Sequence, residues 1–174
     1  MKLRLTLLAL LALPTVACAQ SEQYDVTTLL QDSAYVFNRF DEMTTGLDSQ
    51  IEDWKIPETT KALFKREISS VAKNVNAEKP KLNSLLTKRN VSATELFDVY
   101  LEVIEVSGTL AGQSSNAANW GNDSGSAIQL AEIGAKANVL AAKIGFILRS
   151  KIKDQETQLE SCDIKRSTPM SPNK

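Results

Sequence analysis

Histidine is missing from all 174 residues of the chain, and cysteine occurs only twice. The absence of imidazole excludes Ser-His-Asp and Cys-His catalysis, most zinc sites and haem ligation by histidine. The glycine-rich phosphate loops and the G-x-S-x-G nucleophile motif are missing as well. A hydrolase that uses two carboxylates is the enzymatic alternative that remains. We therefore expect a protein that is not an enzyme and holds neither cofactor nor metal.

The first 19 residues have the pattern of a cleaved export signal. A short basic start with Lys2 and Arg4 precedes an apolar run over residues 5–13. That run is too short to cross a bilayer, which takes about 20 apolar residues. The small-x-small triplet from Ala17 to Ala19 is typical of a signal peptidase site. This pattern predicts an extracytoplasmic protein, periplasmic or secreted, whose mature chain starts at Gln20.

The two cysteines leave two alternatives open. Cys18 is discarded with the signal in the first reading, and in the second it is a lipidation site that anchors the protein to a membrane. Cys162 is then the one thiol of the folded part, so no internal disulfide can form. A lone thiol in an oxidising compartment is either buried or paired between chains. A homodimer linked through Cys162 is therefore one prediction, and a thiol packed into a helix end is the other.

The balance of charge gives no sign of nucleic-acid binding. The chain has 20 basic and 21 acidic residues, and two of the basic ones leave with the signal. A slightly acidic chain lacks the basic footprint of nucleic-acid-binding proteins. The expected partner is instead an unknown protein or an envelope component, with membrane contact only through a lipidated Cys18.

Apolar residues recur at steps of three and four along most of the chain, which predicts helices. The expected helices cover residues 24–54, 57–77, 92–112 and 127–159, and a short helix follows Pro80. No segment alternates with the period of a strand. We predict an all-α, up-and-down bundle of four main helices plus one short helix. Its domain covers residues 20–162, between the signal peptide 1–19 and a flexible, disordered tail over residues 163–174.

Two local signals bound the third main helix. In the stretch "VSATEL", Ser92 and Glu95 have the spacing of a capping box, which predicts a helix start. After Gly112, the stretch "GQSSNAANWGNDSGS" has no apolar periodicity, so we predict a loop over residues 112–126. Trp120 is the one large aromatic residue in this loop. It either caps the core or is an exposed anchor for a partner.

The last helix is apolar around most of its circumference, which predicts that neighbours cover it on several sides. One seam of it is built from small residues and one amide: Ala131, Gly134, Asn138, Ala141, Ala142 and Gly145. Small side chains let a neighbouring backbone approach closely, and a buried Asn138 would fix the register of the pair. The alternative is a groove for a partner helix or an apolar ligand.

Charge is distributed unevenly among the helices. Residues 21–54 carry eight acidic residues against one basic, whereas residues 55–90 carry nine basic against three acidic. Neighbouring antiparallel helices would complement each other in this way. The basic residues would otherwise form a patch for an anionic partner: Lys61, Lys65, Arg66, Lys73, Lys79, Lys81, Lys88 and Arg89. Four acidic residues form a carboxylate stripe on the third main helix: Glu95, Asp98, Glu102 and Glu105. This stripe is expected to face the basic helix, and the alternative is that it binds a divalent ion.

Together these patterns predict a non-enzymatic, exported helical bundle that acts by binding another macromolecule. The alternative is a carrier that holds a small apolar ligand between its helices, beside the small-residue seam. The residues expected to contact a partner or ligand are Trp120, Asn138, Gly134 and Gly145.

Overall fold

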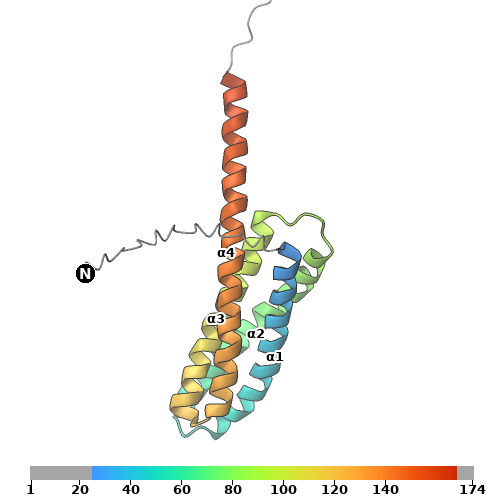
Figure 1. Cartoon of the computed structure of the whole chain (residues 1–174). Helices are drawn as coiled ribbons and strands as arrows, with labels where there is room; N and C mark the ends of the chain where they lie inside the picture. Colours follow the sequence, from blue (N-terminus) through green and yellow to red (C-terminus); the bar gives the residue numbers. More distant parts are fainter. Residues whose placement is uncertain (1–24, 168–174) are drawn as a thin grey trace, which may run out of the picture.

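In the computed structural model, which describes residues 25–167 and side chains as far as residue 159, every regular element is a helix. Four α-helices pack together: α1 (Val26–Asp53), α2 (Glu58–Leu86), α3 (Ala93–Asn116) and α4 (Ser124–Ser167), with the π-helical turn η1 (Ala117–Gly121) between α3 and α4. Consecutive helices run in opposite directions, and α4 projects beyond the others (Figure 1). The prediction of an all-α bundle with four main helices is confirmed. The predicted signal peptide, with Cys18, lies outside the described residues.

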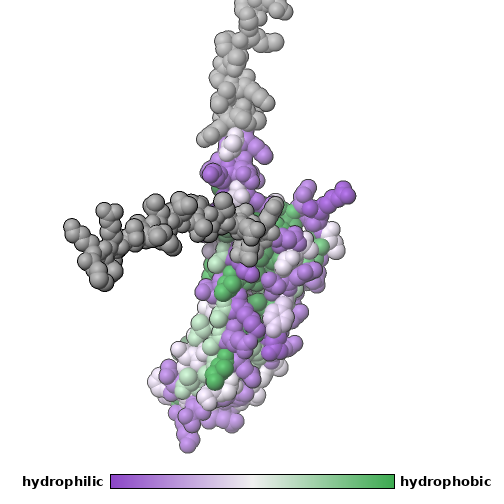
Figure 2. All heavy atoms as spheres, in the orientation of Figure 1, coloured by the Kyte–Doolittle hydropathy of each residue, from purple (hydrophilic) through white to green (hydrophobic). Residues whose placement is uncertain are grey.

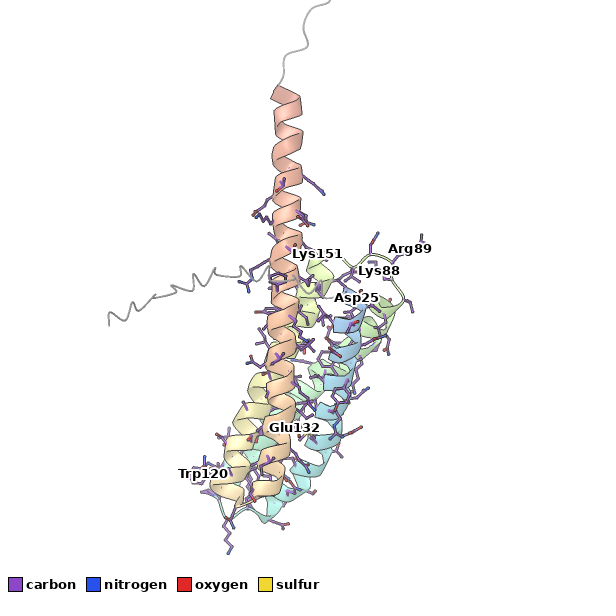
Figure 3. The ribbon with its side chains drawn as sticks, in the orientation of Figure 1. Asp25, Lys88, Arg89, Trp120, Glu132 and Lys151 are labelled. Carbon is purple, nitrogen blue, oxygen red and sulfur yellow. The ribbon has the colours of Figure 1, made fainter. Side chains whose placement is uncertain are left out.

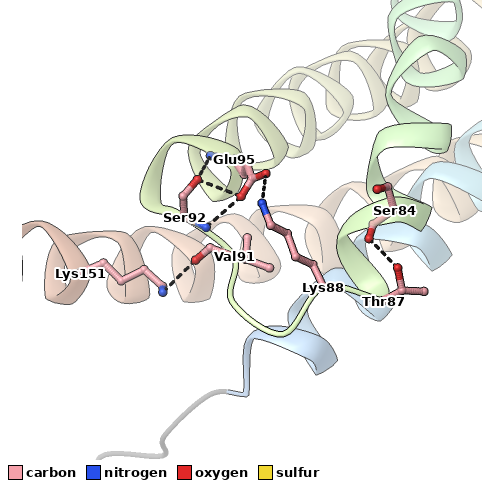
Figure 4. Close-up of polar contacts among 7 residues, drawn as sticks. All are labelled: Ser84, Thr87, Lys88, Val91, Ser92, Glu95 and Lys151. Carbon is pink, nitrogen blue, oxygen red and sulfur yellow. Dashed lines mark hydrogen bonds and ion pairs between the residues drawn. The ribbon is translucent and has the colours of Figure 1, made fainter.

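Side-chain caps start α1 and α3. Asp25 accepts hydrogen bonds from the backbone N–H groups of Thr27 and Thr28, each at 3.3 Å. The predicted capping box at α3 is confirmed: Ser92 Oγ accepts from the N–H of Glu95 at 3.2 Å, and Glu95 accepts from the N–H of Ser92 at 3.0 Å (Figure 4). A hydrogen bond from Lys88, at 2.6 Å, and those from Ser92 lower the pKa of Glu95 to about 2.

The predicted break at Pro80 does not occur. α2 is one continuous helix through Pro80, so the expected separate short helix is part of α2. Proline removes one backbone donor and leaves the carbonyl four residues earlier without its partner. Both Pro80 and Asn76 lie on the exposed side, where water can satisfy that carbonyl. The buried Leu82 and Leu85 continue the stripe of α2 into the core, and this packing keeps the helix intact.

The predicted loop over residues 112–126 is also mostly helical. α3 continues to Asn116, and Gln113 is buried with its Nε2 donating to Glu67 at 3.1 Å. The reversal needs only Asn122 and Asp123 outside the helices, because Asn122 adopts a left-handed conformation with a φ of 50°. Small and polar residues form the inner side of this turn, so hydrophobic periodicity could not reveal its helices.

α4 is longer than predicted and leaves the bundle. Its last buried side chain is Leu148, and all side chains from Ile152 to Leu159 are exposed. The helix continues past the expected end near residue 159 to Ser167, and it includes the first residues of the predicted tail. Cys162 belongs to this projecting part, and its side chain lies outside the described residues.

The core runs along the axis of the bundle between the four helices. Its largest fully buried side chains come from all of them: Phe37, Phe40, Leu47, Ile51, Leu82, Leu96, Leu110, Leu130 and Ile144. At the end where α1 turns into α2, Trp54 is only 4% exposed and meets Phe64 edge to face at 6.1 Å between ring centroids. The core is therefore closed by Trp54 at this end.

Candidate functional site

The two glycines of the predicted seam lie where α4 meets α3. A Cβ on Gly134 would lie 3.3 Å from Leu110 Cβ, and one on Gly145 would lie 3.4 Å from the Tyr100 ring. Ser107 Oγ donates to the carbonyl oxygen of Gly134 at 3.1 Å across the same contact. These approaches confirm the close helix pair. They also mean that Leu110 and Tyr100 occupy the space in which the carrier hypothesis places a ligand.

The rest of the seam does not lie in this contact. Ala141 is buried, but Asn138, Ala131 and Ala142 are exposed. The prediction that Asn138 is a buried amide fixing the register is therefore wrong. The six positions span about 100° of the helix, and the helices around α4 cover only the half of that arc that carries Gly134, Ala141 and Gly145. α4 packs against α3, α1 and η1, as expected of a helix with neighbours on several sides, but this cover leaves the apolar Ile128 and Val139 exposed.

Exposed apolar residues gather on the outer sides of α3 and α4. On α3 they follow one another by four and three residues, with Phe97, Leu101 and Ile104 between 43% and 49% exposed. On α4, Ile128 is 68%, Val139 is 56% and Phe146 is 51% exposed. Small exposed residues lie between them. We call the whole surface the α3–α4 outer face: Phe97, Leu101, Ile104, Gly108, Ala111, Ile128, Ala131, Ala135, Val139, Ala142 and Phe146.

The α3–α4 outer face is continuous because the two helices touch so closely. Phe97 stacks on Tyr100 at 6.0 Å between centroids, and Tyr100 lies against Gly145 of α4. Figure 2 shows the α4 side of this surface, where green apolar atoms along α4 border purple hydrophilic atoms on the side of α1. Contiguous exposed apolar patches larger than a few hundred Å² are uncommon on monomeric proteins, and such patches mark interaction surfaces.

Sequence reasoning missed this face, although a signal was present. The buried stripe of α3 includes Leu96, Val99 and Val103, which satisfies the expected periodicity. Phe97, Leu101 and Ile104 form a second stripe one residue later. A helix with two apolar stripes needs two neighbours, and only one of the stripes is covered within the bundle.

Of the two positions expected for Trp120, the structure shows the exposed one. Trp120 is 56% exposed and projects from the end of the bundle where α3 passes into α4 (Figure 3). The interpretation of Trp120 as a core cap is therefore wrong, and Trp54 fills that place. A Cβ on Gly121 would lie 2.5 Å from Trp54 Nε1, so only glycine lets the turn cross the buried indole. Trp120 stands next to Gly121 and turns outward.

The acidic α1 and the basic α2 pair directly. Lys65 forms ion pairs with Glu52 and, at 3.8 Å, with Asp48, while Lys79 pairs with Asp41. Lys61 is 8% exposed and donates to the backbone carbonyl of Glu52 at 2.7 Å. The complementarity of neighbouring helices is confirmed. Lys61, Lys65 and Lys79 of the predicted basic patch take part in these internal contacts. This weakens the case for an anionic partner on α2.

The carboxylate stripe of α3 faces α2 as predicted. Glu105 accepts a hydrogen bond from Asn74 at 3.3 Å, and Lys88 pairs with Glu95 at 2.6 Å. Glu102 is half-buried, and its Oε2 has no hydrogen-bond partner. Burial first, then the charges of Glu105 and Glu78, raise the pKa of Glu102. Among the described residues, no group of three or more acidic or cysteine side chains could hold a metal ion.

A groove separates α4 from α1. It has a volume of about 550 Å³ and is lined by Asp32, Tyr35, Val36, Glu132, Ala135, Lys136, Val139, Leu140 and Lys143. Its floor is apolar, and its rim carries charges of both signs. A smaller pocket of about 240 Å³ continues along the same two helices past Gly46 and Gln129. The groove therefore lies on the side of α4 that faces α1, opposite Gly134 and Gly145.

Comparisons with known proteins assign the chain to no family. The chain matches no protein-family model, no curated protein and no solved structure. No helix within residues 25–167 combines the length and apolar character that a membrane crossing requires. The function must therefore be inferred from this chain's own residues and surfaces.

Proposed function

We propose that the chain is an exported, non-enzymatic helical bundle that acts by binding another macromolecule in the periplasm or outside the cell. In this proposal residues 1–19 are the export signal, and the α3–α4 outer face is the binding surface. The observation that carries the proposal is the row of exposed Phe97, Leu101 and Ile104 beside the exposed Ile128 and Val139. Large apolar side chains in such a row cost solubility, and a partner that covers them offsets this cost.

Site-specific photo-crosslinking tests the surface. A benzophenone amino acid replaces Leu101 in one variant and Leu63 in a matched control, since Leu63 is an exposed leucine on α2. Both variants are produced in the source cell, irradiated and separated by mass. We expect a discrete heavier adduct from position 101 and none from position 63. Adducts from neither position, or equal labelling from both, would refute the binding surface.

Intact-mass measurement of the exported protein tests the leader. We expect a chain that starts at Gln20, whereas a diacylated Cys18 would support the lipid-anchored alternative. A mass that still includes residues 1–19 would contradict export by this signal. The same spectrum without reducing agent shows whether Cys162 links two chains.

The groove between α1 and α4 supports a second candidate function, the carriage of a small ligand. Its volume of about 550 Å³ falls within the roughly 300–1,000 Å³ of small-molecule sites. The apolar floor with Lys136 and Lys143 at the rim suits a fatty acid. A fluorescent fatty acid should then bind saturably, and Asp32→Trp, which fills the groove from α1, should abolish binding. Asn38→Trp, at an exposed position elsewhere on α1, is the control.

A further inference from the structure

We propose that the partner at the α3–α4 outer face is a second copy of this chain. The two copies are related by a two-fold axis parallel to the helices, so that α3 of each copy lies on α4 of the other. This inference rests on the proposed function, because it names the macromolecule that covers the face. The size of the face supports a dimer, and its charged edges select the arrangement.

The size of the face is enough for a specific interface. The face runs from Phe97 to Ala111 on α3 and from Ile128 to Phe146 on α4, which is about 22 Å and about 28 Å at 1.5 Å per residue. Each helix presents a strip about 10 Å wide. The two strips together cover roughly 500 Å² per copy and roughly 1,000 Å² in the dimer, the size at which a specific interface begins.

Large and small exposed side chains alternate on both helices of the face. On α3, Phe97, Leu101 and Ile104 are large, and Gly108 and Ala111 are small. On α4, small exposed residues separate Ile128, Val139 and Phe146: Ala131, Ala135 and Ala142. Placing α3 on α4 lets the side chains of one copy fill the spaces of the other, as helix packing requires.

The heights of these residues along the bundle agree with this arrangement. Gly145 lies against Tyr100 and Gly134 lies against Ala111, so Leu101 is level with the space between Ala142 and Phe146. An axis parallel to the helices keeps every residue at its own level. Leu101 of one copy therefore meets α4 of the other copy between Ala142 and Phe146.

The charged edges of the face select the same axis. Asp98 and Glu105 are exposed on the edge of α3 that points away from α4. The far edge of α4 carries Lys136 and Lys143 together with Glu132, which pairs with Lys136 at 2.9 Å. With the axis parallel to the helices, the acidic edge of each copy meets the lysine edge of the other. An axis across the helices would set acidic edge against acidic edge, which is repulsive.

Sedimentation equilibrium of the full chain, with reducing agent present to exclude a Cys162 disulfide, tests the dimer. We expect twice the mass of the chain. Leu101→Arg should raise the dissociation constant at least about 30-fold, as loss of a central hot-spot contact does. Leu63→Arg, the same change on α2, should leave it unchanged. Circular dichroism checks that both variants remain helical. A monomer, or a dimer insensitive to Leu101→Arg, would overturn the inference.

Charge exchange tests the axis, and crosslinking separates the two proposals. Asp98→Lys with Glu105→Lys should weaken the dimer, and adding Lys136→Glu with Lys143→Glu should restore it. Failure of this restoration overturns the arrangement. In the Leu101 crosslinking experiment, an adduct of twice the chain mass supports the second copy. An adduct with a different macromolecule overturns the second copy but supports the proposed function, and the absence of any adduct overturns both.

Discussion

The two sides of α4 differ in how closely their neighbours approach. On the α3 side, Gly134 and Gly145 bring the helices into direct contact, and a hydrogen bond from Ser107 crosses the interface. On the α1 side, the helices leave a groove of about 550 Å³ and a further pocket beside Gly46. Glycine on a helix therefore has no fixed meaning. It permits close packing where a neighbour reaches it, and otherwise it only lowers helix stability.

Gly134→Leu should give the largest effect, because it forces a side chain into the closed side. A Cβ at this position already lies 3.3 Å from Leu110 Cβ and 3.5 Å from the backbone nitrogen of Ala111. Overpacking costs about 1–3 kcal/mol, so the melting temperature should fall by about 5–10 °C. Thermal unfolding followed by circular dichroism measures it. Gly46→Leu is the matched control. An equal fall in the melting temperature of both variants would contradict the difference in packing between the two sides of α4.

Gly46→Ala should stabilise the protein. No atom lies within 4 Å of a Cβ at this position in α1, so the substitution gains helix propensity without a clash. The gain of about 1 kcal/mol should raise the melting temperature by about 2–4 °C. A fall instead would mean that α4 closes over the pocket in solution.

Ser107→Ala should destabilise the protein slightly. It removes the donor to the Gly134 carbonyl at 3.1 Å, while that carbonyl keeps its place in the α4 backbone. We expect a loss of about 0.5 kcal/mol, or about 2 °C in melting temperature. Ser126→Ala removes a hydroxyl that bonds to Gln50 at an exposed position between α4 and α1, and it should change less. A larger fall in melting temperature for Ser126→Ala than for Ser107→Ala would show that α4 packs more tightly on α1 than on α3.

Glu102→Gln should give the smallest effect. Glu102 lies on the side of α3 that faces α2, where the contact is formed by charged side chains and not by small ones. The raised pKa of Glu102 means that ionisation of this carboxyl opposes folding above that pKa, and that the penalty disappears below the ordinary value. Glu102→Gln should therefore raise the melting temperature by about 1 °C at neutral pH, since solvent screens the effect. Below pH 4 the difference should vanish. Glu156→Gln, at an exposed position of α4, serves as the control, and a gain at acidic pH would contradict the assigned cause.

Features carried by neighbours in the chain could be predicted from the sequence. The capping box of Ser92 and Glu95, the four long apolar stripes and the opposite charges of α1 and α2 are all observed. The candidate site was predicted less well. Gly134 and Gly145 lie in a close contact as expected, but Asn138 is exposed and Trp120 projects outward. Those two positions depend on which arc of a helix its neighbours cover, and periodicity does not specify that arc.

The starts of the first three helices and the all-α character follow from the sequence alone, because caps and three-to-four-residue periodicity act over a single turn. The tertiary structure decided which apolar side chains are covered. α3 and α4 each carry apolar residues around much of their circumference, and either stripe of α3 could have entered the core. The close approach at Gly134 and Gly145 turned Leu96 and Val103 inward. It left Phe97, Leu101 and Ile104 on the outside, because a helix held that tightly by one neighbour cannot present both of its stripes to the same core.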